Sequence, residues 1–203
     1  KTRKLSLMYL RWALCTAGYC LYFCGIAALF CLPAHGHSVC NGKVAIGLFS
    51  VGIWARDEEL YKILSSKTAQ AELRRGRHPA EFTGRKLDLL VAAPDAVGWA
   101  GAGAVDCSTV LIHGAAGPLA RSLRTGCAVS YGTSPKDTLT FSSLEGDQIC
   151  LALQRELVTL AGDIVERQEL VLPFPVGQDP LLFLSVAGTL LLLGVPAEAL
   201  DLR

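Results

Sequence analysis

The stretch Leu87-Asp88-Leu89-Leu90-Val91-Ala92-Ala93, closed by Pro94, decides the fold class of this 203-residue chain. It is short and almost wholly apolar, which is typical of a strand that is buried on both faces of a parallel sheet. Similar runs occur at residues 44–51, 109–112 and 128–131. These strands predict a parallel sheet covered by helices.

Helical patterns separate these runs. Residues 58–74 carry apolar side chains at helical spacing among charges, with acids in the first turn and arginines around Gly76. This predicts an amphipathic helix, and residues 118–123 predict a second, short one. The alternation of strands and helices predicts an α/β domain with a Rossmann-like, mostly parallel sheet.

The pattern changes after Gly132. Apolar residues alternate with polar or small ones in residues 139–141 and 149–153, and Glu145-Gly146-Asp147 separates the two segments as a hairpin turn. A second turn at Gly162-Asp163 leads into a strand at residues 164–172. Together these segments predict an antiparallel three-strand meander that extends the parallel sheet.

Residues 180–193 form the last long apolar run. Asp179 at the N-cap and Pro180 at the first helical position predict a helix start, and Gly194 predicts its end. The run is shorter than the roughly 20 residues needed to cross a bilayer. Because it is apolar nearly all round, we expect a helix inside the domain.

Charge divides the chain into two parts. Residues 1–56 contain six basic residues and no acidic one, and residues 12–32 carry no charge. A helix of that length can span a hydrocarbon core of about 30 Å. We therefore expect a basic N-terminus at 1–42 with an apolar, candidate transmembrane helix at 12–32, and a main domain at 43–203. The alternative is that the N-terminal segment is not native to the protein.

Composition and cysteine spacing exclude several classes of protein. With 51% hydrophobic residues the chain is not disordered, and a net charge of +1 indicates no nucleic-acid partner. A cluster that could in principle bind zinc consists of Cys31, His35, His37 and Cys40. Its compressed spacing matches no usual zinc-site pattern, so we assign no metal and no cofactor.

The second half of the chain carries a recognisable series of short motifs. Ala128-Val129-Ser130-Tyr131-Gly132 is followed by Asp137, by the strands of 138–172, by Leu172-Pro173 and by Leu193-Gly194-Val195-Pro196. In this order and spacing, residues 109–202 resemble the second half of the central domain of the Mur ligases, the ATP-dependent amino-acid ligases of cell-wall synthesis. The resemblance covers just under half of the chain and implies an α/β domain.

The chain departs from this family where the chemistry takes place. A Mur ligase has a glycine-rich loop ending in Gly-Lys-Thr/Ser that holds the nucleotide phosphates, and this sequence has no such loop. The family's His-Asn pair before the final helix is replaced by Gln178-Asp179, and its Asn-Asp pair by His113-Gly114. Because phosphoryl transfer needs a phosphate cradle and magnesium ligands, the resemblance implies a reduced, non-catalytic relative.

One group of residues remains as a candidate ligand site. Carboxyl ends of parallel strands meet at one edge of a sheet, where ligands collect, and N–H groups at a helix start attract anions. The candidate residues are His113, Gly114, Gly117, Tyr131, Gly132 and Asp137. The alternative is that the glycines only permit a tight turn. His113 has no second group at a diagnostic spacing for acid–base catalysis.

Three functions are therefore left open. The first is a non-catalytic Mur-ligase-like domain that binds a partner protein or a small anionic ligand in cell-envelope metabolism. The second is an ATP-dependent ligase fragment completed by a partner chain, and the third is a membrane-tethered scaffold. The positive-inside rule puts the basic N-terminus in the cytoplasm and the main domain on the opposite side of the membrane. Cys107, Cys127 and Cys150 show no pairing pattern, which favours the cytoplasm for the main domain. We expect a cytoplasmic main domain, tethered through residues 12–32 if that segment is native.

Overall fold

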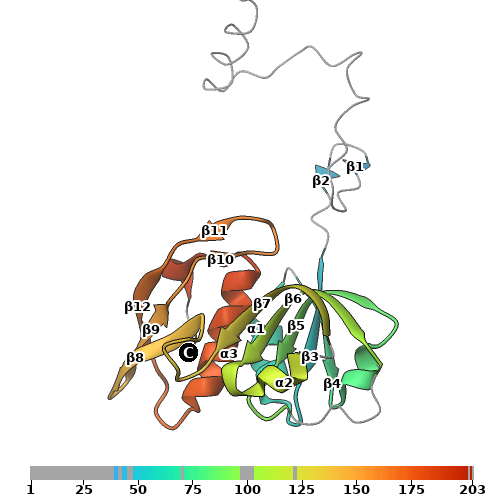
Figure 1. The fold of residues 1–203 in the computed structure, drawn as a ribbon. Coiled ribbons are helices and arrows are strands. Elements are labelled where there is room, and N and C mark those ends of the chain that lie inside the picture. Colours follow the sequence, from blue (N-terminus) through green and yellow to red (C-terminus); the bar gives the residue numbers. More distant parts are fainter. Residues whose placement is uncertain are drawn as a thin grey trace, which may run out of the picture. The chain divides into compact units, whose positions relative to one another are not determined.

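The computed structural model describes residues 39–40, 43–44, 48–69, 71–96, 103–120, 123–200 and 202 (Figure 1). The chain divides into two units, Lys1–Val44 and Ala45–Arg203. In the first, the described residues form one antiparallel pair, β1 (Val39–Cys40) with β2 (Lys43–Val44). The predicted helix at 12–32 and the side chains of the Cys/His cluster lie outside the described residues. Among the described helices, none has the length and apolar character that a membrane crossing requires.

The second unit is built on an eight-stranded sheet with the order β12-β9-β8-β7-β6-β5-β3-β4. Its strands are β3 (Phe49–Trp54), β4 (Ala71–Gly76), β5 (Lys86–Ala92), β6 (Val105–His113), β7 (Leu123–Tyr131), β8 (Leu139–Glu145), β9 (Gln148–Leu153) and β12 (Gln168–Pro173). All neighbouring strands from β4 through β3, β5, β6 and β7 to β8 are parallel to one another. β9 is antiparallel to both of its neighbours, β8 and β12. The predicted α/β class with an antiparallel extension is confirmed.

Two short strands stand apart from this sheet. β10 (Leu157–Val158) pairs with β11 (Ile164–Val165), and Gly162 makes the turn between them with φ of +95°. The predicted strand at 164–172 is therefore split, because its first residues pair with β10 and only its later residues join β9.

The helices are α1 (Glu59–Lys67), α2 (Gly117–Ala120) and α3 (Pro180–Leu192), with 3₁₀ turns η2 (Pro79–Phe82), η3 (Gly114–Ala116) and η4 (Ala197–Ala199). The prediction of one helix over 58–74 is wrong in its second half, because α1 ends at Lys67 and the chain then forms β4. Thr68 is extended, and Leu73 pairs with Val51 of β3. Pairing along the edge of the sheet therefore outweighs helix propensity in this segment.

Helix α3 is an interior element, as predicted. The Asp179 carboxylate accepts a hydrogen bond of 2.9 Å from the Leu181 N–H and so caps the first turn. Every residue from Leu182 to Leu192 is buried. Gly194 takes φ of +86° and ends the helix. The helix belongs to the larger of two hydrophobic cores.

The two cores lie on opposite faces of the sheet. The larger joins α1 and α3 to strand residues such as Val51, Leu111 and Leu139. The smaller gathers Trp54, Phe82 and neighbouring strand residues under η2 and α2. Helix α1, between β3 and β4, thus lies over one face, whereas η2, between β4 and β5, and α2, between β6 and β7, lie over the other.

Strand β7 is paired very differently on its two sides. β6 pairs with it from Val105↔Leu123 to His113↔Tyr131. β8 pairs with it only at Tyr131↔Leu139, and the two strands diverge from that pair (Figure 1). Most of β7 therefore has a partner strand on one side only among the described residues.

Candidate functional site

The carboxyl ends of the parallel strands form the edge where a site is expected. The chain leaves β3 toward β4 on one side, while β5, β6 and β7 lie on the other side of β3. Such a reversal opens a crevice between the two central strands, and ligands of open α/β sheets bind there. The relevant residues are those directly after β3 and β5.

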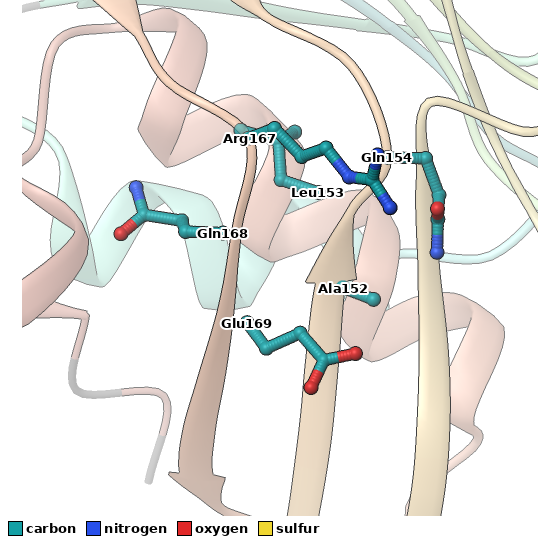
Figure 2. A pocket seen from close by; sticks show the side chains of 6 residues that line it. All are labelled: Ala152, Leu153, Gln154, Arg167, Gln168 and Glu169. Carbon is teal, nitrogen blue, oxygen red and sulfur yellow. The ribbon is translucent and has the colours of Figure 1, made fainter.

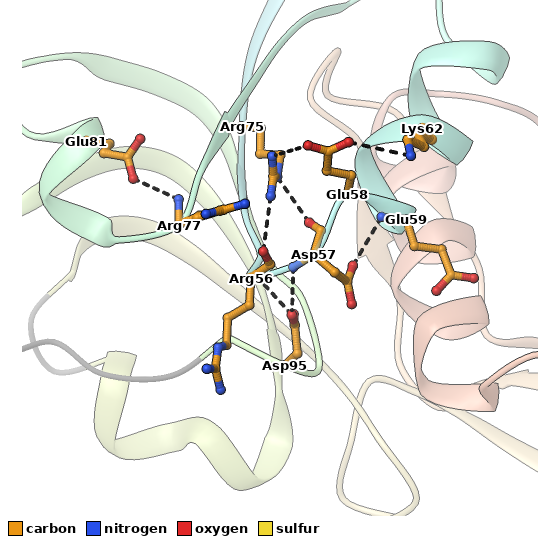
Figure 3. A network of polar contacts seen from close by, with 9 residues as sticks. All are labelled: Arg56, Asp57, Glu58, Glu59, Lys62, Arg75, Arg77, Glu81 and Asp95. Atoms are coloured by element: carbon orange, nitrogen blue, oxygen red, sulfur yellow. Dashed lines mark hydrogen bonds and ion pairs between the residues drawn. The ribbon is translucent and has the colours of Figure 1, made fainter.

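At this crevice, one carboxylate from the end of β5 holds the loop after β3. Asp95 Oδ2 accepts hydrogen bonds from the N–H groups of Arg56 (2.9 Å) and Asp57 (3.1 Å). Asp57 Oδ1 accepts one from the Glu59 N–H at the start of α1, at 3.1 Å. Figure 3 shows these contacts side by side. The N–H groups that could bind an incoming anion therefore already bind the protein's own carboxylates.

Arg75 of β4 binds the carbonyl groups of the same loop. Its Nε donates to Asp57 O at 3.1 Å and its Nη2 to Arg56 O at 3.0 Å, while Nη1 pairs with Glu58 Oε1 at 3.0 Å (Figure 3). Only 19% of the Arg75 side chain is exposed. Together, Asp95 and Arg75 satisfy donors and acceptors of the loop and hold its backbone in one conformation.

A second carboxylate occupies the ends of β6 and β7. Asp137 is 6% exposed, and its Oδ2 accepts a hydrogen bond of 3.2 Å from the Ser134 N–H. A Cβ at Gly132 would lie 2.5 Å from Asp137 Oδ2, and one at Gly114 would overlap Oδ1. Both glycines are therefore required by the close approach of this carboxylate to the backbone.

Tyr131 ties two strands together at this edge. Its ring is fully buried, and its hydroxyl donates a hydrogen bond of 2.7 Å to Ala92 O at the end of β5. Burial raises the pKa of Tyr131, and the negative charges of Asp95 and Asp179 raise it further. The hydroxyl is therefore neutral and already bonded, so it acts as a structural group.

The structure brings together five of the six predicted site residues. His113 stacks obliquely on Tyr131, with ring centroids 5.6 Å apart and planes at 58°. His113 Nε2 would lie 3.4 Å from a Cβ at Gly132, beside the Asp137 carboxylate. Gly117 is exposed, with open space around its Cβ position, and does not belong to this cluster.

The sequence analysis missed Asp95 and Arg75. Asp57 and Glu58 were interpreted as acids of a helix start, and Arg75 as a residue of the helix C-terminus. The useful signal for Asp95 is its position just beyond Pro94, which closes the strand pattern of residues 87–93. Arg75 could not be found while residues 71–76 were expected to be helical.

Two cavities lie elsewhere in the domain. One, of about 210 Å³, lies beside β9 and β12 and is lined by Ala152, Leu153, Gln154, Arg167, Gln168 and Glu169 (Figure 2). The other, of about 340 Å³, is lined by residues of α1 and of the segment before α3, where Gln178 Oε1 is buried without a hydrogen bond. Neither is lined by the residues around Asp137. Within the described ranges, no three side chains of His, Cys, Asp or Glu are placed to hold a metal ion.

No family model matches this chain, and no curated protein matches it either.

Proposed function

We propose that this chain is a non-catalytic, Mur-ligase-like domain that binds a partner protein in cell-envelope metabolism, with its main domain in the cytoplasm. The proposal takes its family from the motif series of residues 109–202. Its support in the fold is the order of elements, since a Rossmann-like parallel sheet leads into three antiparallel strands and a final buried helix.

The observation that carries the non-catalytic part is the carboxylate of Asp95. In nucleotide-binding α/β folds the first strand–helix turn receives phosphates on its free N–H groups. Here the N–H groups of Arg56 and Asp57 are bonded to Asp95. A phosphate at this turn would have to displace that carboxylate and would be repelled by it.

The charges at this edge disfavour a small anionic ligand, so the proposal takes a protein partner. The negative charges of Asp95 and Asp179 both raise the pKa of Tyr131, so both carboxylates act on the buried hydroxyl at this edge. Asp137 adds a third carboxylate at the ends of β6 and β7. Three carboxylates disfavour a small anion, whereas a folded partner can bind over other surfaces of the domain.

Thermal unfolding of the full chain tests the non-catalytic part. We expect that MgATP, a UDP-sugar or a muropeptide precursor, each at about 5 mM, leaves the Tm unchanged and that no ATP is hydrolysed. This concentration exceeds the substrate KM values of most enzymes, which reach about 1 mM. A rise in Tm with MgATP would contradict the non-catalytic part, and ATP turnover by the chain together with a co-purifying protein would support the ligase-fragment alternative instead.

In-cell crosslinking of the tagged full chain in its native host tests the partner part. We expect one protein of envelope synthesis to be recovered in a fixed ratio, equally well after ATP depletion. Elution of the chain alone in every condition would contradict the proposal. The scaffold alternative concerns residues 12–32, and carbonate extraction of the same tagged chain tests it, since release into the soluble fraction would reject it.

A further inference from the structure

Strand β7 has an edge that the described part of the chain leaves unpaired. We use the name open edge of β7 for the side of residues 123–129 that faces away from β6. β6 pairs with β7 along its length except at Gly126, but β8 reaches it only at Tyr131. Gly126, Cys127 and Ala128 are all exposed, so both faces of the strand are accessible there.

Main-chain hydrogen-bonding groups point out from this edge. The Gly132 N–H donates to Leu139 O at 3.0 Å, which shows that the groups of Gly132 point toward β8. Alternate residues of an extended strand point their N–H and C=O groups to the same side. Because the register with β6 is unbroken from Cys127 to Tyr131, the N–H and C=O of Ala128 point to the open edge. A further strand could bond to them.

The outer edges of the sheet, on β4 and β12, are protected, whereas residues 125–130 of β7 are not. Natural edge strands carry charged residues or proline that prevent strand addition. β4 carries Glu72, Arg74 and Arg75, and β12 carries Glu169 and ends at Pro173. Residues 125–130 of β7 contain no charge and no proline. An edge segment without such protection is open to strand addition and indicates a docking surface.

The charges beside the edge specify what would dock. Lys86, Asp106 and Arg124 lie opposite one another on β5, β6 and β7, so charges of alternating sign form a row across the strands. Arg124 Nη1 lies 3.9 Å from Asp106 Oδ1, and 74% of the Arg124 side chain is exposed. An acidic residue on an added strand would continue the row, since opposite charges on neighbouring strands stabilise pairing. The small residues Gly126 and Ala128 leave room for a large apolar side chain beside that acidic residue.

We propose that the open edge of β7 binds an extended segment of a partner protein by strand addition. The segment places an acidic residue opposite Arg124 and a large apolar residue beside Gly126 and Ala128. Main-chain hydrogen bonds supply affinity, and these two side chains supply specificity. The inference rests on the proposed function, for which it names the surface and the kind of partner.

A random library of twelve-residue peptides, selected on the immobilised full chain, tests this proposal. We expect the enriched peptides to share an acidic residue and a nearby aromatic or branched apolar residue. Arg124→Glu and Ala128→Pro should each weaken a selected peptide about tenfold, which corresponds to about 1.4 kcal/mol. The matched control is Glu169→Lys on the β12 edge, which should leave the peptide Kd unchanged. Failure to enrich any peptide, or equal binding to all variants, would overturn the proposal.

The thiol of Cys127 reports occupancy of the same edge without any change of sequence. Its labelling by a maleimide should slow at least severalfold when a selected peptide is bound, and unchanged labelling with bound peptide would place the peptide elsewhere and overturn the proposal. Arg124→Glu still tests the proposal if the Ala128→Pro variant does not fold. Peptides that bind elsewhere would leave the proposed function standing, whereas failure to recover any partner from the native host would contradict that function independently.

Discussion

Asp95 is one half-buried carboxylate that orders a whole loop, because two consecutive N–H groups depend on it. Asp95→Ala should lower the free energy of unfolding by about 1 kcal/mol, since the contacts are solvent-exposed and partly screened. Added sulfate should recover part of that loss by binding the freed N–H groups. Urea unfolding with and without sulfate measures both effects. Asp106→Ala should show neither, and a sulfate effect of equal size in both variants would contradict this role.

Gly132 is required by the neighbouring carboxylate and not by its own backbone angle. Gly132→Ala should destabilise the protein by about 1–3 kcal/mol, because the new methyl group meets Asp137 Oδ2. Asp137→Ala should remove most of that added cost, so the double variant should be less destabilised than the sum of the two single variants. Urea unfolding of the four proteins measures this coupling energy. Gly117→Ala is the control, because open space surrounds Gly117 and alanine favours the helix; additive effects at Gly132 and Asp137 would refute the contact.

The buried hydroxyl of Tyr131 predicts how stability depends on pH. Since its pKa in the folded state is raised above the value of about 10 of an exposed tyrosine, its contribution is complete below pH 10. Above that pH the unfolded chain releases a proton that the folded chain keeps, so the free energy of unfolding falls. Tyr131→Phe should be less stable at neutral pH by about 1–2 kcal/mol but should lose less stability between pH 9 and 11. Equal slopes in urea titrations of the two proteins would show that Tyr131 does not cause the loss.

Among the elements, α3 contributes most to the larger core. Leu184 is fully buried, so Leu184→Ala should lower the free energy of unfolding by about 2–5 kcal/mol. Val176 lies just before the helix and is 86% exposed, so Val176→Ala should change it by less than about 0.5 kcal/mol. Chemical denaturation compares the two variants. A similar cost at both positions would mean that α3 is not an interior element.

The elements that could be predicted from the sequence are those whose signals are local. Helix α3 combines an N-cap aspartate, a proline at the first position and a C-terminal glycine, and each acts on its own neighbourhood. β5 was found because both of its faces are buried. β4 was missed because it is a charged edge strand, and its pairing with β3 is a long-range contact that leaves no period in the sequence.

The candidate site could also be predicted only in part from the sequence. Glycines and polar residues at strand ends mark the carboxyl edge of the sheet, so His113, Gly114, Tyr131, Gly132 and Asp137 could be predicted to meet. Which groups bond to one another could not be predicted, because Asp95 lies 39 residues and Arg75 lies 19 residues from Arg56 of the loop that both bind. Their roles depend on the order of the strands, which only the fold reveals.

At the scale of the whole molecule, the sheet has a well-paired parallel part and an antiparallel part that meet at β7 and β8. Amide hydrogen exchange should report this directly. The Val129 N–H points toward β6 and should be protected, whereas the neighbouring Ala128 N–H points to the open edge and should exchange at least tenfold faster. Residue-resolved exchange by NMR measures the pair. Equal protection of the two amides in the isolated chain would mean that another segment already covers the edge.

The single residue pair Tyr131↔Leu139 has a mechanical consequence. The two parts of the sheet are joined by backbone pairing at this residue pair only. Helix α3 contacts β6, β7 and β8, so its packing transmits force between the two parts. Force applied perpendicular to the strands should separate β7 from β8 first. The packing of the leucine side chains of this helix would then resist further separation. The domain should therefore resist force along its strands and yield to force that pulls β7 and β8 apart.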